Sequence, residues 1–261
     1  MNLKIYQLDA FTDTLFGGNP AAVCPLTEWL PDELLQNIAM ENNLAETAFY
    51  VREKDGYRIR WFTPAVEVDL CGHATLAVAQ VLFFIENYSK PVLEFQSRSG
   101  KLRVVRENDL LTLNFPTDPI REVTITDEFL NCFSVVPIKV YKGLTDYMFI
   151  FENESQITQI KPDLTRIGKL NGRGVIITAI GNEVDFVSRF FAPQSGIDED
   201  PETGSAHTSL TPYWNAVLQK DKMTAIQLSK RKGFLKCRYL GDRVEISGKV
   251  RLYMSGEIYI E

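Results

Sequence analysis

Histidine is scarce in this chain of 261 residues, because His73 and His207 are the only two. They lie far apart, and neither stands in the close Cys/His spacing of a zinc site. Gly-x-Gly-x-x-Gly and Walker motifs, which would indicate a bound nucleotide, are also absent. The sequence therefore predicts neither a metal ion nor a cofactor.

Cysteine is rare as well, with four widely separated residues and no Cys-x-x-Cys pair, a pattern that favours reduced thiols over a disulfide framework. The first twenty residues lack a basic segment followed by an apolar one. The longest apolar stretch, near residues 76–85, is interrupted by Gln80 and is too short to span a bilayer. We therefore expect a cytoplasmic protein that does not enter the membrane. The cysteines are Cys24, Cys71, Cys132 and Cys237.

Runs of basic residues are missing too, and the net charge is -6. A surface of this charge argues against binding to nucleic acid or to an anionic membrane. The Gly-x-Ser-x-Gly motif of many serine hydrolases does not occur, and Ser205 has no evident base partner in the sequence. The sequence therefore argues against a nucleic-acid-binding protein, a membrane-surface protein and a serine hydrolase.

Strands account for most of the patterned sequence, in which polar and apolar residues alternate as in half-buried strands. Arg58-Ile59-Arg60-Trp61 is a clear case. Strands are predicted at residues 5–8, 47–51, 58–61, 93–96, 111–114, 139–141, 147–151, 175–178, 185–191, 234–239 and 243–246.

Helices are few. Pro31 followed by two acidic residues makes a good first turn, and the helix it begins should end near Asn42-Asn43. The stretch from about Ala74 to Glu86 is apolar on all sides, which predicts a helix buried within curved sheet. A third helix follows Ser205, where Pro212 predicts a kink or a late start.

One pattern occurs twice, as an aromatic strand end, Phe-x-Pro, a short acidic loop and a helix start of the form [Cys/Thr]-Gly-[His/Ser]-Ala. The copies span residues 62–74 and 191–206, and the second loop is three residues longer. We therefore predict an α+β fold of two pseudo-symmetric domains, each a curled, mostly antiparallel sheet around a central helix, with the two helix starts facing one cleft. The expected domains are residues 1–116 and 119–261, with the option that the last strand, about 250–261, returns to the first domain.

Several polar residues near these helix starts are candidates for chemistry, and each has a second, purely structural interpretation. Glu46 is either a surface acid or a general base tuned by partial burial. His73 is either a capping residue or a neutral imidazole, since a helix N-terminus disfavours its charged form. Asp200 either complements a helix dipole or supplies a second carboxylate, and Ser205 either caps the helix or binds a ligand. His207 is expected to be structural, as is the turn Gly17-Gly18-Asn19-Pro20.

Together these motifs resemble the PhzF-like (phenazine-biosynthesis isomerase) family over nearly the whole chain. The matching strings include Gly18-Asn19-Pro20-Ala21-Ala22-Val23, Asn43-Leu44-Ala45-Glu46-Thr47, Cys71-Gly72-His73-Ala74-Thr75 and Asp200-Pro201-Glu202-Thr203-Gly204-Ser205. The resemblance implies a diaminopimelate-epimerase-like fold, a homodimer, and proton transfer on a small carboxylic acid without a cofactor.

The resemblance also implies roles for individual residues. Glu46 matches the catalytic acid/base, and His73 and Asp200 match residues of the catalytic site. Substrate binding is expected to involve Asn19, Gly72, His73, Gly204 and Ser205, with backbone amides at both helix starts holding the carboxylate and the developing negative charge.

Thr203 distinguishes the isomerase implied by this resemblance from a racemase with two catalytic cysteines. In diaminopimelate epimerase and proline racemase a cysteine stands at each helix start, whereas here Cys71 faces a threonine in the second copy, and a hydroxyl is far too weak a base. Two alternatives stay open, namely an epimerase that uses Cys71 with Glu46, and a binding protein without catalysis on the same scaffold.

Overall fold

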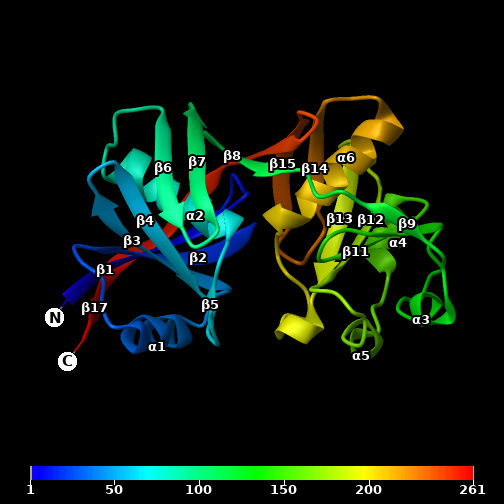
Figure 1. The fold of residues 1–261 in the computed structure, drawn as a ribbon, viewed down its shortest axis with the longest axis horizontal. Coiled ribbons are helices and arrows are strands. Elements are labelled where there is room, and N and C mark those ends of the chain that lie inside the picture. The colour runs from blue at the N-terminus through cyan, green and yellow to red at the C-terminus, as the bar shows by residue number, and fades with distance from the viewer. Residues whose placement is uncertain (1, 261) are drawn as a thin grey trace. The chain divides into compact units, whose positions relative to one another are not determined.

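The chain folds into two compact units in the computed structural model, which describes residues 2–260 (Figure 1). The first unit combines Met1–Asn114 with Ser247–Glu261, and the second is Phe115–Ile246. The expected second domain of 119–261 is therefore shortened at its end, because the last strand belongs with the first unit.

The described part of the first unit holds two α-helices and a π-helical turn among its strands. Its elements are β1 (Asn2–Ala10), β2 (Asn19–Leu26), α1 (Asp32–Asn42), β3 (Glu46–Glu53), β4 (Gly56–Phe62), β5 (Glu67–Val68), α2 (Gly72–Gln80), η1 (Val81–Ile85), β6 (Val92–Ser97), β7 (Gly100–Glu107), most of β8 (Leu110–Pro116), and β17 (Val250–Tyr259).

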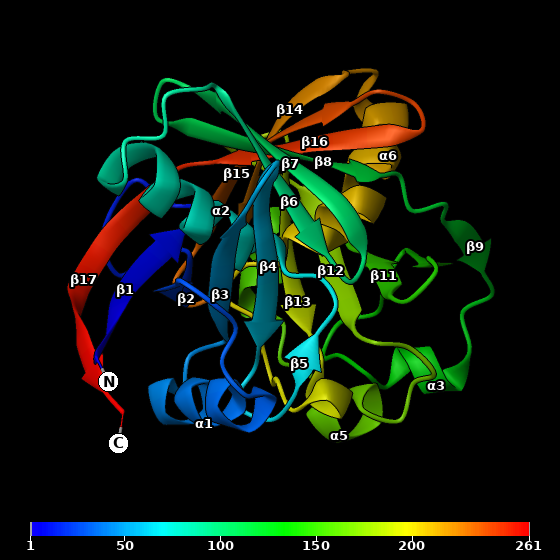
Figure 2. The ribbon, with the colours of Figure 1, turned by 60° about the vertical axis from the view of Figure 1, so that its left-hand side comes forward.

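Strand β17 returns to the first unit because it pairs antiparallel with β1 along nearly its whole length, from Asn2 opposite Tyr259 to Ala10 opposite Val250 (Figure 2). A one-residue irregularity between Gln7 and Leu8 interrupts the register. The two ends of the chain therefore lie in neighbouring strands.

The second unit repeats the plan of the first with more short helices. Its elements are β9 (Arg121–Val123), α3 (Asp127–Leu130), β10 (Lys139–Lys142), β11 (Tyr147–Ile150), α4 (Glu154–Gln159), α5 (Leu164–Ile167), β12 (Val175–Ile180), β13 (Phe186–Phe191), η2 (Pro193–Ser195), η3 (Gly204–Ala206), α6 (His207–Leu218), β14 (Lys222–Gln227), β15 (Gly233–Tyr239), and most of β16 (Arg243–Gly248).

Strand pairing shows the duplication directly. In the first unit, successive pairs run antiparallel (β1–β2), parallel (β2–β3), antiparallel (β3–β4), parallel (β4–β6) and antiparallel (β6–β7). The second unit has the same alternation through β10–β11, β11–β12, β12–β13, β13–β14 and β14–β15. Because each parallel pair needs a crossover connection, helices fill the same two places in both units.

Helices cover both faces of the first unit's sheet. Alternate residues such as Cys24 and Phe49 pack in one apolar cluster with Leu35 and Ile38 of α1. Their neighbours point the other way, and Tyr50 donates a hydrogen bond of 2.6 Å to Glu86, at the end of η1. The sheet therefore lies between α1 and the α2–η1 helix, which is buried from His73 to Ala79 as its apolar sequence predicts.

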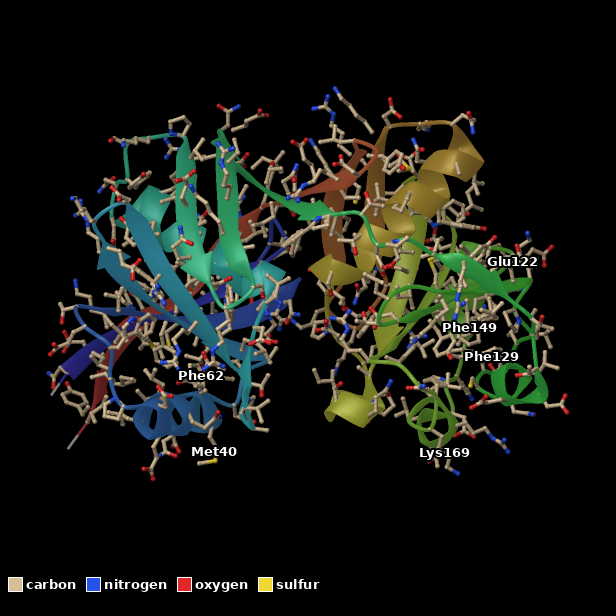
Figure 3. The ribbon with its side chains drawn as sticks, viewed as in Figure 1. Met40, Phe62, Glu122, Phe129, Phe149 and Lys169 are labelled. Atoms are coloured by element: carbon tan, nitrogen blue, oxygen red, sulfur yellow. The ribbon has the colours of Figure 1, made fainter. Side chains whose placement is uncertain are left out.

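The second unit is built alike. Its outer cluster joins α3, α4 and α5 to one sheet face, with Phe129 and Phe149 in edge-to-face contact at 5.6 Å (Figure 3). On the other face, Trp214 of α6 stacks on Phe186 and donates a hydrogen bond of 2.9 Å to Thr178. Helix α6 thus corresponds to α2.

Two local expectations need correction, and the late start of the third helix is confirmed. The helix expected from Ala74 begins at Gly72 and closes with the π-turn Val81–Ile85. The expected turn at Gly17–Pro20 continues into β2, which starts at Asn19 and pairs with β1. The third helix starts late, at His207, because residues Gly204–Ala206 form a 3-10 turn. The short helices α3 to α5 and the strands β2, β5, β7, β9 and β14 were not expected, whereas β17 matches the last strand expected at about 250–261.

No helix among residues 2–260 is both long enough and apolar enough to cross a membrane.

Candidate active site

Three side chains meet at the N-terminus of α2. The carboxylate Oε2 of Glu46 lies 3.0 Å from Nε2 of His73, and the Cys71 sulfur lies 3.5 Å from Nδ1 of the same ring. All three side chains are largely shielded from solvent. The imidazole therefore stands between a carboxylate and a thiol.

Local folding explains this meeting. Glu46 is the first residue of β3 and is in register with Ala21 of β2. The side-chain alternation of β3 turns Glu46 to the same face as Tyr50, the face that α2 covers. Asn19 lies two residues before Ala21, so it projects from the same face, and it is fully buried.

The protonation of His73 differs from the expectation of a neutral ring. Burial alone would lower its pKa, but the Cys71 sulfur and the Glu46 carboxylate reverse this and hold the pKa of His73 well above 6.5. Burial, and next to it the Glu46 charge, raises the pKa of the Cys71 thiol to about 11, so the thiol is uncharged at neutral pH. The Cys71 sulfur and the Glu46 carboxylate together therefore favour a proton on His73, against burial and against a helix terminus worth about 0.3–1 kcal/mol.

Glu46, Cys71 and His73 also offer one oxygen, one sulfur and one nitrogen within 4.8 Å of one another. This is a donor set that zinc accepts, and sequence spacing alone did not suggest it. However, the sulfur lies nearer Nδ1, at 3.5 Å, than Nε2, at 3.9 Å, while the carboxylate faces Nε2. The carboxylate oxygen and the sulfur thus lie nearest to different nitrogens of the ring.

The second unit holds Asp200 in a network of its own. Thr203 donates a short hydrogen bond from its hydroxyl to the Asp200 carboxylate. Buried Gln227 then bridges the loop, donating to the Asp200 carbonyl at 2.7 Å and accepting from the Thr203 amide at 2.9 Å. Thr203, the residue that replaces a second cysteine, therefore positions Asp200.

Ser205 sits in the 3-10 turn beside an arginine that the sequence did not single out. Nη2 of Arg173 donates to the Ser205 hydroxyl at 3.0 Å. The same guanidinium forms two hydrogen bonds with buried Asp146, from Nε at 3.0 Å and from Nη2 at 2.5 Å. The only sequence signal was an Arg between two glycines in Asn171-Gly172-Arg173-Gly174.

His207 is structural, in agreement with the sequence. Its Nδ1 lies 3.0 Å from the Thr203 carbonyl, which fixes the tautomer with the proton on Nδ1. Burial lowers the pKa of His207 to about 4, so the ring is neutral. Glu202, which is also fully buried, lies 3.8 Å from the same nitrogen.

The expected site residues thus fall into two groups by unit. The first unit contains Glu46, His73, Gly72 and Asn19, and it brings Glu46 and His73 into direct contact. The second unit contains Asp200, Gly204 and Ser205 in one loop and turn. Sequence reasoning missed the contact of Cys71 with His73 and the roles of Arg173 and Gln227.

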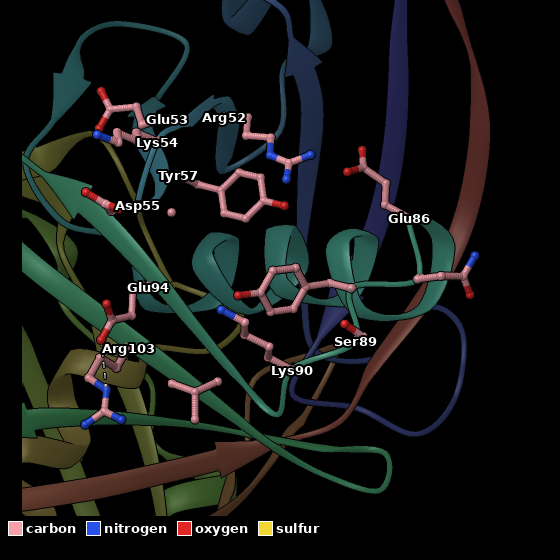
Figure 4. Close-up of a pocket in the computed structure, with 14 residues that line it drawn as sticks. Arg52, Glu53, Lys54, Asp55, Tyr57, Glu86, Ser89, Lys90, Glu94 and Arg103 are labelled. Atoms are coloured by element: carbon pink, nitrogen blue, oxygen red, sulfur yellow. Dashed lines mark ion pairs between the residues drawn. The ribbon is translucent and has the colours of Figure 1, made fainter.

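A cavity of about 710 Å³ in the first unit contains none of these residues (Figure 4). Arg52, Tyr57, Glu86 and Lys90 are among the side chains that line it. Both signs of charge are present, and Glu94 pairs with Arg103 within it. This charged cavity lies at the C-terminal end of β3, whereas Glu46 is at the N-terminal end of the same strand.

The class of fold is that of epimerases and racemases. A hydroxyproline epimerase of Agrobacterium vitis, crystallised with bound trans-4-hydroxy-L-proline, superimposes with a TM-score of 0.63 at 9% identity, with 98% of this chain and 92% of that one covered. Together with the duplicated topology, this identifies the diaminopimelate-epimerase-like fold.

Sequence comparison gives the family. The phenazine biosynthesis-like protein family model (PhzC-PhzF) matches residues 8–256, and the chain belongs to this family. A protein of Pseudomonas aeruginosa named an uncharacterized isomerase is 51% identical over 260 residues, with both chains fully covered. The crystal structure of a PhzF-family protein of Enterococcus faecalis has a TM-score of 0.97 at 44% identity, again over the full length of both chains. The chain is therefore an enzyme of the PhzF isomerase type.

Proposed function

We propose that this enzyme moves a proton between carbons of a small cyclic or amino/hydroxy carboxylic acid without a cofactor, with Glu46 as the acid/base. The observation that supports this most is the buried contact of Glu46 with His73 at 3.0 Å. Among residues 2–260, the buried Oε2 atom of Glu46 has its ion pair with His73 but no hydrogen-bond partner.

In the proposed reaction, the Glu46 carboxylate takes a proton from a substrate carbon, and the electron pair of that C–H bond delocalises towards the substrate's conjugated or carboxyl group. Glu46 then returns the proton to another carbon, so that no atoms are gained or lost. Amides of Gly72 and His73 in the first turn of α2 stabilise the developing negative charge. His73, charged and adjacent, keeps the Glu46 carboxylate oriented.

Residues of the second unit complete the proposal. Asp200, whose carboxylate Thr203 orients, is assigned to the substrate's amine or hydroxyl group, and Gly204 and Ser205 to its carboxylate. Asn19 is assigned to substrate binding in the first unit. The enzyme is proposed to work as a homodimer, which sedimentation equilibrium tests directly.

Deuterium uptake is the test of Glu46. The enzyme is incubated in heavy water with candidate cyclic amino and hydroxy acids, and uptake at carbon is followed by mass spectrometry. Loss of a positioned acid/base typically costs about 10²–10⁴-fold, so Glu46→Gln should lower the exchange rate by that factor. Glu53→Gln is the matched control, because Glu53 ends the same strand, is exposed and pairs with the exposed Arg58. Equal exchange by both variants would remove Glu46 from the mechanism.

An epimerase that uses Cys71 with Glu46 is the second candidate, favoured by the 3.5 Å approach of the thiol to His73. The thiol pKa of about 11 speaks against a thiolate base at neutral pH. Cys71→Ala separates the two, because it abolishes exchange in the epimerase and largely preserves it in the Glu46 isomerase. Absence of exchange with every substrate, alongside normal binding, would instead indicate a non-catalytic binding protein.

A further inference from the structure

The cavity at the C-terminal end of β3 is lined by residues of the first unit and lies outside the candidate active site (Figure 4). Its walls are residues 52–57 at the turn from β3 to β4, residues 86–90 after η1, and side chains of β6 and β7. Tyr57, which is only 7% exposed, packs edge-to-face against Tyr88 at 6.2 Å. The cavity volume of about 710 Å³ is within the range of small-molecule sites.

Two of the acids that line the cavity are neutralised by cations of the protein itself. Glu94 pairs with Lys101 at 2.7 Å and also lies 3.6 Å from Arg103. Glu53 pairs with Arg58 at 2.8 Å. These two carboxylates therefore do not repel an anion that enters the cavity.

Three cations of the cavity have no such partner. Among residues 2–260, none forms an ion pair or a hydrogen bond with the side chain of Arg52, Lys54 or Lys90. They come from the end of β3, from the turn that follows it and from the loop after η1. Burial raises the pKa of Tyr57 and the charge of Arg52 opposes this rise, while Lys90 lies within electrostatic reach of Glu94. Separate segments thus bring these positive charges to one cavity.

The balance of charge in the cavity is positive. Asp55 and Glu86 are the lining acids without a cationic partner among residues 2–260. The Glu86 carboxylate accepts a hydrogen bond of 2.6 Å from the neutral Tyr50 hydroxyl, which leaves its charge in place. Three unpaired cations, together with the second cation beside Glu94, outweigh these two acids. Although the whole chain has a net charge of -6, this cavity therefore attracts an anion.

The end of η1 opposes an anion only weakly. The carbonyl groups at a helix C-terminus carry partial negative charge where they lack partners. Here the amides of Glu86 and Tyr88 donate to the carbonyl groups of Val81 and Leu82, each at 2.9 Å. The side chains of the loop therefore decide the sign of the local potential.

We propose that this cavity is a second binding site, which takes a small organic molecule through a phosphate group held by Arg52, Lys54 and Lys90. A phosphate monoester carries nearly two negative charges and three strong acceptor oxygens, so it suits three separate cations better than a carboxylate does. Glu46 lies six residues before Arg52 in β3, about 20 Å away at about 3.3 Å per residue. The site is therefore distinct from the candidate active site and goes beyond the proposed function.

Isothermal titration calorimetry at low ionic strength tests the ligand class. The probes are phenyl phosphate, inorganic phosphate and benzoate. Phenyl phosphate should bind most tightly, because it combines the phosphate group with an apolar part that covers the lining near Tyr88 and Val92. Benzoate should bind at least about tenfold more weakly, since it has one negative charge and two oxygens.

Variants of exposed side chains locate the site without disturbing the fold. Arg52→Met and Lys90→Met should each weaken phenyl phosphate by about tenfold, the scale of a hydrogen bond to a charged group. Asp55→Asn removes an opposing charge and should strengthen binding by a smaller factor. Lys236→Met is the control with the same change in net charge, because Lys236 is exposed in β15 of the second unit. Glu46→Gln should leave binding unchanged.

No binding of phenyl phosphate, or binding that survives in both Arg52→Met and Lys90→Met, would overturn the inference. So would an equal loss in Lys236→Met, or benzoate or inorganic phosphate that binds as tightly as phenyl phosphate. Loss of binding in Glu46→Gln would place the phosphate in the candidate active site and overturn a second site. Phosphate binding that depends on Arg52 and Lys90 supports the inference even where no deuterium exchange occurs, a result that contradicts only the proposed function.

Discussion

At the scale of the residue, tertiary contacts of His73 override the effect of the helix N-terminus on its charge. A helix N-terminus disfavours a charged imidazole, but the Cys71 sulfur and the Glu46 carboxylate, the latter at 3.0 Å, together reverse the balance. The proximity of Glu46 to His73 depends on the register of β3 with β2, which brings Glu46 under the start of α2. Cys71 adds a weakly polar neighbour that remains a thiol.

Imidazole NMR can measure this directly, since the chain has only two histidines. We expect His73 to titrate well above pH 6.5, and its pKa to fall in Glu46→Gln, where the charge that stabilises the imidazolium is removed. His207, with a pKa of about 4, should not titrate between pH 6 and 8 and serves as the internal reference. A His73 signal that titrates below 6.5 in the native protein would contradict the ion pair.

The same shift has a consequence for stability. Because the folded-state pKa of His73 is raised above its unfolded value of about 6.5, the stabilisation is complete below about pH 6.5 and is lost as pH rises through the folded pKa. Urea unfolding from pH 6 upwards should show this decline in the native protein and a smaller one in Glu46→Gln.

At the scale of the element, the hairpin β14–β15 supports the loop that carries Asp200. Gln227, the last residue of β14, bonds to the loop at two points and is in register with Gly233, the first residue of β15. A Cβ atom added at Gly233 would lie 2.3 Å from Cγ and 2.8 Å from Cβ of Glu202, which is fully buried. This strand start therefore requires glycine.

Gly233→Ala is accordingly expected to lower the free energy of unfolding by about 1–3 kcal/mol, the usual cost of overpacking, and to weaken substrate binding through the shifted loop. Gly256→Ala in β17 is the matched control, because a Cβ atom there meets nothing within 4 Å, and its effect should stay within about 0.5 kcal/mol. Thermal and urea unfolding measure the stabilities of the two variants. If Gly233→Ala is as stable as Gly256→Ala, Glu202 can move aside.

At the scale of the whole molecule, the two units differ in the number of chain segments that form them. The second unit is one uninterrupted stretch, Phe115–Ile246, whereas the first needs Ser247–Glu261 to supply β17 beside β1. An edge strand of nine residues without its neighbour leaves a row of unpaired backbone groups.

We therefore expect residues 115–246 to fold alone with a cooperative unfolding transition. Residues 1–114 should fold poorly unless 247–261 are joined to them through a short linker. Circular dichroism and amide-proton NMR of the three fragments provide the measurement. A well-folded 1–114 fragment would show that β17 is dispensable.

The sequence alone determined the features that depend on local pattern or duplication. Alternating residues predicted most of the strands, the uniformly apolar stretch after Ala74 predicted a buried helix, and the repeated Phe-x-Pro and Gly-polar-Ala segments predicted two similar halves. It did not reveal β2, because Gly18-Asn19-Pro20 looks like a turn, and it left open whether the last strand, about 250–261, returns to the first domain. It also named Glu46, His73, Asp200 and Ser205 as candidates.

Only the tertiary structure decided which side chains touch. Strand register and helix placement bring Glu46, Cys71 and His73 together, and they place Arg173 against Ser205 although 32 positions separate them in the chain. Such contacts, and the pKa shifts that follow from them, depend on distances of a few ångströms between distant segments. Local propensity fixes the elements of this protein, whereas the packing between elements determines the charge and orientation of its candidate catalytic groups.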